Sequence, residues 1–172
     1  AASSLAAGLG HTCALLRTGG IKCWGSNGSG QLGDGTTTSR SAPASVSGLS
    51  SGTAAIAAGY GHTCALLSTG AVTCWGYNAY GQLGDGTTTD RSTPVDVPGL
   101  SSGVTAIAVG NIHTCALLDT GGVRCWGRNE YGQLGDGTTV DRIAPVDVSG
   151  LSSRVTAIAA GMSNSCALLV SG

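Results

Sequence analysis

Short runs of apolar and small residues alternate with polar turns along the whole chain. Between residues 53 and 103 these runs read TAAIAAG (53–59), HTCALL (62–67), VTCWG (72–76) and TPVDV (93–97). Each run is short and bounded by turn-forming residues, which is typical of β-strands. The segment YNAYGQLGDGTTTDRS (77–92) has no helical period and is expected to form an irregular excursion. The pattern therefore predicts four short antiparallel strands and no helix.

The same pattern returns every 51 residues. His11, His62 and His113 keep this spacing, and Asn164 takes the next position. The cysteines and tryptophans follow the same period, at Cys13, Cys64, Cys115 and Cys166 and at Trp24, Trp75 and Trp126. A period of this size indicates a repeat architecture. We expect complete units at about 2–52, 53–103 and 104–154, and a partial unit at 155–172.

Four antiparallel strands per unit favour a β-propeller, with one blade per unit. The small-residue strand is expected to be innermost, because blades crowd together near the axis. The strand that contains Pro94 is expected at the outer edge, because proline cannot donate to a ladder. The alternative is a β-solenoid, although its coils are usually shorter than these units.

The unit AAGYGHTCALLSTGAVTCWGYNAYGQLGDGT (57–87) resembles the repeat of the regulator of chromosome condensation family. The hallmarks of that repeat are an HT-AL strand, a WG-N corner and a GQLG turn. Here they fall on His62, Trp75, Gly76, Asn78 and Gly81 to Gly84, and the resemblance covers essentially the whole chain. It implies a propeller, usually of seven blades. It does not imply the nucleotide-exchange activity of the founding member, which belongs to an insertion and a surface not found here.

About three and a third units cannot close a ring of seven. We therefore expect either a piece of a longer chain or self-association through the unfinished ends, into a ring or an open fibre. The cysteines are not part of the general family pattern. They resemble the secreted bacterial branch of the family, which includes a β-lactamase inhibitor protein of this fold.

Each complete unit carries two cysteines, as at Cys13 and Cys23. With residues 17–19 as the hairpin loop, these two lie directly opposite each other and within disulfide range. We expect bridges that each stabilise the fold by about 2.5–3 kcal/mol as an upper estimate, with Cys166 left unpaired or joined to another molecule. Free thiols, or a zinc site that includes His11, are the alternatives, but no fourth zinc ligand recurs. The expected pairs are Cys13–Cys23, Cys64–Cys74 and Cys115–Cys125.

The repeated polar residues suggest structural roles. Three equivalent histidines on three units do not converge on one place, as an active site requires. Asp34, Asp85 and Asp136 each precede glycine, and we expect their carboxylates to bond backbone amides in turns. Calcium binding is the alternative. We expect no catalytic residues, no metal and no cofactor.

Positions at which the units differ are the candidates for partner recognition, because a position that builds the scaffold requires the same residue in every unit. Ser26, Tyr77 and Arg128 are equivalent, as are Ser29, Tyr80 and Tyr131. Tyrosine and arginine are typical interface anchors. Tyr80 and Tyr131 are expected to be exposed. The alternative is that these loop positions vary without any role in binding, as surface loops commonly do. The predicted binding loops contain Tyr60, Tyr77, Tyr80, Asn111, Ile112, Arg128, Glu130 and Tyr131.

The composition of the chain disfavours some classes of partner and favours a location. The net charge is -1 and only 10% of residues are charged, which argues against a nucleic-acid partner. No apolar run is long enough for a membrane span. Seven cysteines favour an oxidising, extracellular or cell-surface location. We therefore predict a non-enzymatic secreted or surface propeller module that acts as a structural assembly unit or a protein-binding scaffold. The alternative is an inhibitor or adhesin, and an enzyme is disfavoured because Glu130 is the sole glutamate.

Overall fold

The computed structural model describes residues 1–170, which form strands and loops with no helix. Unit one holds β1 (Ala2–Ala7), β2 (His11–Leu16), β3 (Ile21–Gly25) and β4 (Arg40–Ser45). Unit two holds β5 (Thr53–Ala58), β6 (His62–Leu67), β7 (Val72–Gly76) and β8 (Arg91–Asp96). Unit three holds β9 (Val104–Val109), β10 (His113–Leu118), β11 (Val123–Gly127) and β12 (Arg142–Asp147). A fourth, two-stranded sheet holds β13 (Val155–Ala160) and β14 (Ser165–Leu169), and residues 171–172 of the segment 155–172 lie outside the described part.

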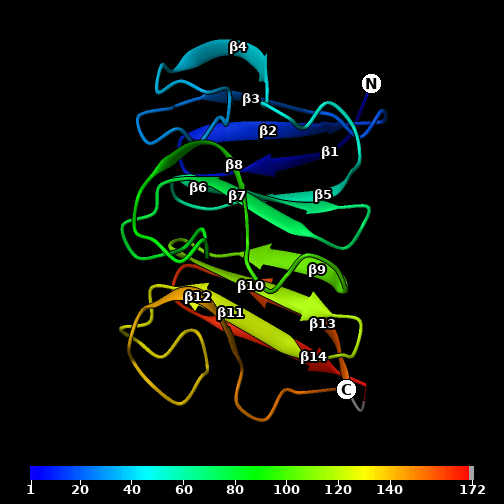
Figure 1. Cartoon of the computed structure of the whole chain (residues 1–172), viewed down its shortest axis with the longest axis vertical. Helices are drawn as coiled ribbons and strands as arrows, with labels where there is room; N and C mark the ends of the chain where they lie inside the picture. The colour runs from blue at the N-terminus through cyan, green and yellow to red at the C-terminus, as the bar shows by residue number, and fades with distance from the viewer. Residues whose placement is uncertain (171–172) are drawn as a thin grey trace.

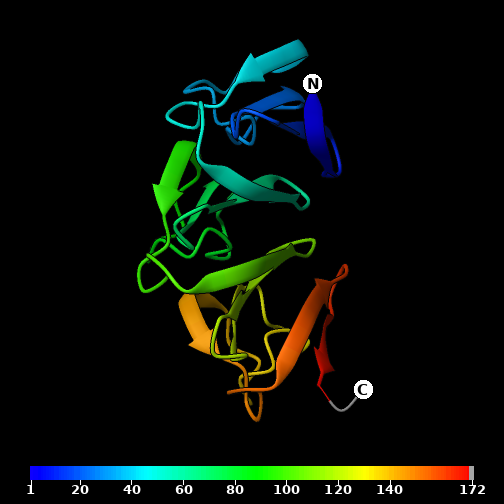
Figure 2. The ribbon, with the colours of Figure 1, turned by 90° about the vertical axis from the view of Figure 1, so that its right-hand side faces the viewer.

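Each complete unit is an antiparallel sheet in simple sequence order, as β5-β6-β7-β8 is in unit two (Figure 1). The first strands of successive units contact one another, β1 with β5, β5 with β9 and β9 with β13. Figure 2 shows the units as an arc, with these first strands on one side and β8 and β12 on the other. The predicted all-β blade architecture is confirmed, and the proline-containing strands β4, β8 and β12 are the outer edges.

In each complete unit, the hairpin formed by the second and third strands carries the predicted disulfide. Cys13 faces Cys23 across β2 and β3 and is bonded to it, with their Cα atoms 4.1 Å apart. Cys64–Cys74 and Cys115–Cys125 repeat the arrangement. The paired sulfurs are buried in the hydrophobic core of their unit, whereas Cys166 is free and exposed. Each bridge therefore reinforces a core built mainly from small and aliphatic side chains.

Neighbouring units are joined by a repeated set of hydrogen bonds, which we call the seam. In the first seam the Gln31 carbonyl accepts from the Thr63 hydroxyl at 3.0 Å and from Trp75 Nε1 at 2.9 Å. Gly33 packs against the same indole at φ +69°, and a Cβ there would lie 2.7 Å from Nε1. The second seam has the same plan, with the Gln82 carbonyl accepting from Thr114 and Trp126. The seam buries Trp75 and Trp126 completely.

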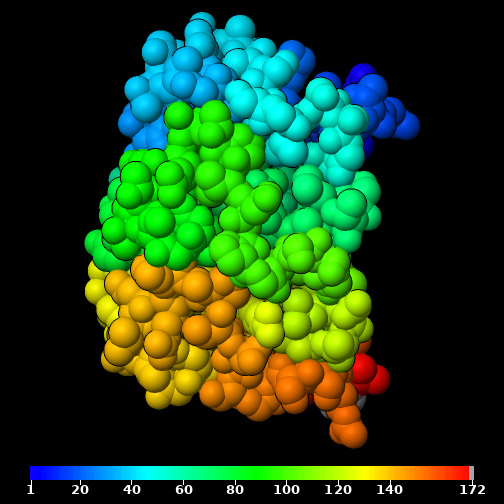
Figure 3. All heavy atoms as spheres, in the orientation of Figure 1, coloured from blue at the N-terminus to red at the C-terminus, as the bar shows by residue number. Residues whose placement is uncertain are grey.

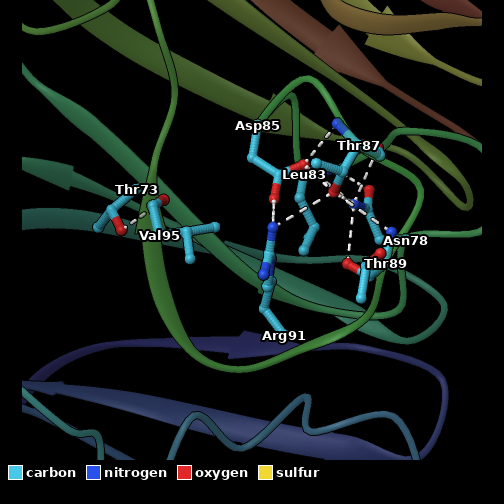
Figure 4. Close-up of polar contacts among 8 residues, drawn as sticks. All are labelled: Thr73, Asn78, Leu83, Asp85, Thr87, Thr89, Arg91 and Val95. Carbon is cyan, nitrogen blue, oxygen red and sulfur yellow. Dashed lines mark hydrogen bonds and ion pairs between the residues drawn. The ribbon is translucent and has the colours of Figure 1, made fainter.

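The excursion between the third and fourth strands is organised by one buried asparagine. In unit two, Asn78 Nδ2 donates to the carbonyls of Thr87 and Thr89 at 3.1 and 3.0 Å, and Oδ1 accepts from the Leu83 amide (Figure 4). Asp85 accepts from the Thr87 amide at 3.0 Å and pairs with Arg91. The expected bond from the repeated aspartate to backbone amides is therefore present. These internal bonds hold the excursion in one shape.

Candidate protein-binding face

One edge of the molecule collects the positions that vary between units, and we call it the variable edge. It is formed by the turns 8–10, 59–61 and 110–112 together with the first residues of the excursions, 26–31, 77–82 and 128–133. Backbone bonds tie each turn to its excursion, as when the Tyr77 amide donates to the Gly61 carbonyl at 2.8 Å. The excursions, light blue, green and yellow, abut along the left of Figure 3. Variable positions that are distant in sequence thus share one surface.

Four aromatic and cationic side chains form a continuous group on this edge, which we call the tyrosine–arginine cluster: Tyr60, Tyr77, Tyr80 and Arg128. The ring centres of Tyr60 and Tyr77 are 6.4 Å apart, as are those of Tyr77 and Tyr80, and both pairs are edge-to-face. The guanidinium carbon of Arg128 lies 4.9 Å from the centre of the Tyr80 ring. The cluster therefore spans units two and three.

The Arg128 contact corrects one expectation about exposure. Tyr131 is 71% exposed, as expected, but Tyr80 is half-buried. Arg128 of the next unit lies over the Tyr80 ring and covers it. Tyr80 belongs to unit two and Arg128 to unit three, so their contact depends on how the units are arranged in space.

An ion pair extends the cluster on the side of unit three. The Arg128 guanidinium donates to the Glu130 carboxylate. This hydrogen bond raises the pKa of Arg128 and lowers that of Glu130, while the hydrogen bond with Glu130 raises the pKa of Tyr131. Both charges are engaged with each other, so the edge presents aromatic surface and hydroxyl groups rather than a net charge.

The remaining predicted residues also lie at this edge. The carbonyl of Asn111 accepts from the Tyr60 amide at 2.9 Å, and that of Ile112 accepts from the Arg128 amide at 2.9 Å. Leu9 and Met162, at positions equivalent to Tyr60, are each 75% exposed. The predicted binding loops did not include these two residues. Their equivalence to Tyr60 in the repeat is the signal in the sequence that indicates them.

The three histidines lie beneath the variable edge and serve the scaffold. His11 Nε2 is 2.8 Å from the Thr63 hydroxyl oxygen. Because that hydroxyl uses its proton on the Gln31 carbonyl, the histidine must be the donor, and Nε2 carries the proton. His62 and Thr114 repeat the arrangement. No threonine proton is directed at a histidine, so the pair does not form an activated nucleophile.

Burial keeps these histidines neutral. It lowers the pKa of His11 and of His113 to about 4 and that of His62 to about 3, with the neighbouring histidines lowering the last one further. Gly59 packs on the His62 ring, and a Cβ there would lie 2.7 Å from Cε1. The predicted structural role of the repeated histidines agrees with this environment.

Among residues 1–170, no group of three or more His, Cys, Asp or Glu side chains could hold a metal ion. Over the same range, no helix is long and apolar enough to cross a membrane. The variable edge can stack on aromatic or cationic groups and exchange hydrogen bonds, which is the chemistry of protein recognition.

Known proteins share both the repeat and the fold. The family model described as "Regulator of chromosome condensation (RCC1) repeat" matches residues 19–66, 69–117 and 120–168. The human protein "Probable E3 ubiquitin-protein ligase HERC4" is 37% identical over 171 residues, covering 97% of this chain and 16% of the relative. The chain therefore spans only a small part of that relative.

Solved structures show the same arrangement of strands. Yeast RCC1 (Prp20), crystallised with Kap60, superposes with a TM-score of 0.83 at 24% identity, covering 99% of this chain and 42% of that one. The ectodomain of the Physcomitrella patens receptor kinase CR4 gives a TM-score of 0.59 at 24% identity, covering 98% of this chain and 36% of that one. These three proteins are eukaryotic, so the resemblance to a bacterial secreted branch stays a prediction.

Proposed function

The chain belongs to the regulator of chromosome condensation (RCC1) repeat family, and from that premise we propose that it is a non-enzymatic protein-binding propeller module. It recognises its partner through the variable edge. The tyrosine–arginine cluster provides the anchors, with Glu130, Tyr131, Asn111 and Ile112 around it.

One contrast carries this proposal. The seam is repeated from unit to unit, whereas the edge directly above it changes from Ser26 to Tyr77 to Arg128 at one position. The changed side chains are not scattered, because Tyr60, Tyr77, Tyr80 and Arg128 contact one another. Tyrosine and arginine supply large contact area at low entropic cost and are enriched at interface hot spots.

The same contrast bears on the kind of module. A binding module is expected to have loops that vary between units, and this edge differs in each complete unit. It therefore favours a binding scaffold, of which an inhibitor or adhesin is one form, over a structural assembly unit. Yeast RCC1, with the same fold, was crystallised with a protein partner, Kap60, which supports this function class.

An oxidising location, at the cell surface or secreted, fits the three disulfides. Such bridges persist mainly outside the cytosol. The CR4 ectodomain shows that this fold occurs in an extracellular segment. Thiol titration of the native protein purified from its source, unfolded without reductant, tests this part. One free thiol per chain is expected, and seven would contradict the assignment.

Affinity capture tests the binding proposal. Unit one provides the substitutions, because it has serine at the equivalents of both Tyr80 and Tyr131. We expect at least one surface protein to be captured by the native chain and reduced at least about tenfold with the Tyr80→Ser/Tyr131→Ser variant. The control is Asp119→Ser, at the opposite-edge hairpin where unit two has Ser68.

Two results would count against the proposal. The first is a set of captured proteins that does not differ between the native chain and the double variant. The second is a loss that is equally large with Asp119→Ser. Self-association through the unfinished ends is the alternative, and it would appear as a concentration-dependent mass of the purified chain that the double variant leaves unchanged.

A further inference from the structure

A groove crosses the variable edge between units one and two. Its volume is about 370 Å³. It is lined by Leu9, Ser26, Ser29 and Gln31 of unit one and by Tyr60 and Tyr77 of unit two, together with three glycines. Within residues 1–170, no charged side chain lines this groove. We call it the unit-one groove.

The boundary between units two and three shows which side chain the groove lacks. At the equivalent positions one unit later, Tyr77 replaces Ser26 and Tyr80 replaces Ser29. The Tyr80 ring reaches towards the next unit and lies under Arg128, the equivalent of Tyr77. In unit one the residue equivalent to Tyr80 is Ser29, which has no ring. Unit one therefore places no aromatic ring against Tyr77. The small residues of unit one leave open the place that an aromatic ring fills in unit two.

The polar side of the groove suits a ring with a hydroxyl group. Gln31 Nε2 donates to Ser26 Oγ at 3.4 Å, which is a long bond that a better acceptor can replace. In unit two, where Tyr77 replaces that serine, the buried Gln82 Nε2 has no hydrogen-bond partner among the described residues. The amide at this position is therefore left without a partner when no serine hydroxyl lies beside it, and Ser26 and Ser29 both line the groove.

We propose that the unit-one groove binds one tyrosine side chain of a protein partner. The ring lies against Tyr77, as Tyr80 lies against Arg128 one unit later, and the phenol bonds to the Gln31 amide or the serine hydroxyls. This inference rests on the proposed function, since it gives the variable edge a specific ligand group. The uncharged lining disfavours lysine, aspartate and glutamate side chains, which would lose water without gaining a counter-charge.

A titration with a minimal probe tests the inference. The ¹⁵N-labelled chain is titrated with N-acetyl-L-tyrosinamide and followed by amide chemical shifts. We expect saturable shifts at Ser29, Gly61 and Tyr77, with a dissociation constant on the order of millimolar for so small a ligand. N-acetyl-L-phenylalaninamide and N-acetyl-L-argininamide are expected to bind at least about threefold more weakly, because the first lacks the hydroxyl and the second lacks both the ring and the hydroxyl.

A filled groove provides the matched variant. Ser29→Tyr gives unit one the residue that units two and three already carry at this position, so the fold accommodates it. We expect this variant to lose the saturable shifts. Ser68→Tyr, which adds the same side chain on the opposite edge, is expected to keep them. The dispersion of the amide spectrum verifies that both variants are folded.

Three results would overturn the inference: no saturable shift with the native chain, unchanged affinity after Ser29→Tyr, or tighter binding of the arginine probe. Its failure can be told apart from failure of the proposed function. A negative titration together with partner loss in Tyr80→Ser/Tyr131→Ser rejects only the groove. A positive titration with no partner loss in that variant rejects only the proposed use of the cluster.

Discussion

The seams and the variable edge lie a few residues apart in the chain, yet the seam residues are the same from unit to unit whereas the edge residues differ. Beneath the surface, the Gln31 carbonyl binds Thr63 and Trp75, and the Gln82 carbonyl binds Thr114 and Trp126 in the same way. At the surface, the equivalent residues are Ser26, Tyr77 and Arg128. The difference shows that the units are joined by buried backbone acceptors, which leaves the side chains above them free to change.

Acid should break this comparison most strongly, because the histidines that it protonates lie on the buried side. The folded-state pKa values of His11, His62 and His113, at about 4, 3 and 4, lie below the ordinary value of 6.5. The unfolded chain therefore takes up protons that the folded chain does not. The stability that the neutral histidines provide is complete above pH 6.5 and is lost as the pH falls towards 4. Each histidine contributes a slope of about 1.4 kcal/mol per pH unit in this window.

Three such slopes, of about 4 kcal/mol per pH unit together, reach the total stability of an ordinary domain within two or three units. Urea titrations at pH 7, 6, 5 and 4 measure this effect. The variant His62→Asn uses the residue that the fourth unit has at Asn164, and it should remove about a third of the acid sensitivity. A flat profile between pH 7 and 5 would show that the histidines titrate normally.

Loss of a seam tryptophan is the next largest effect. Trp75→Ala leaves a cavity and removes one of the two hydrogen bonds to the Gln31 carbonyl, and we expect it to cost about 3–5 kcal/mol in the free energy of unfolding. Trp24, its half-buried equivalent, is the control, and Trp24→Ala should cost clearly less. Chemical denaturation followed by far-ultraviolet circular dichroism measures both. Equal losses would mean that coverage by the preceding excursion adds nothing.

Removal of one disulfide should have a smaller effect. The bridge Cys64–Cys74 closes a short hairpin, with its cysteines ten positions apart. The chain-entropy model gives at most about 2.5–3 kcal/mol for such a loop. Cys64→Ser/Cys74→Ser should therefore lower the free energy of unfolding by that amount or less. Cys166→Ser, which removes the exposed thiol, is the control and should leave stability unchanged.

The smallest effects belong to the variable edge. Tyr131→Ala should change the free energy of unfolding by no more than about 0.5 kcal/mol, since the ring is 71% exposed. Tyr80→Ala should cost slightly more, because it also removes the contact with Arg128, which is worth about 0.5–1 kcal/mol at an exposed site. Thermal melts of the two variants test the order. A loss at Tyr131 as large as that at Trp75 would show that the edge is part of the core.

Much of this architecture follows from local rules. Counting residues along a two-strand hairpin is enough to place Cys13 opposite Cys23, because antiparallel pairing has a period of two. The outer position of Pro94 follows from its missing amide proton in the same way. The contacts between units could not be obtained like this. The acceptor for Trp75 is the backbone carbonyl of Gln31, and a backbone carbonyl has no sequence signature.

For the variable edge, too, the sequence indicated the residues but not their contacts between units. Differences between units indicated which residues to consider, including Tyr80 and Arg128. Their stacking depends on the rotation between units, which no single unit encodes. For the same reason, the groove over Ser29 is visible only when the two boundaries are compared in space.

The seam also has a genetic consequence. Its acceptor comes from one unit and its donors from the next, with the same geometry at the two boundaries between complete units. A cassette of 51 residues can therefore be duplicated, deleted or exchanged by recombination, and both new junctions will still find matching partners. Such an exchange moves a whole section of the surface at once and leaves the interior unchanged. Diversity can thus arise by shuffling intact units, without a series of point mutations that must each preserve folding.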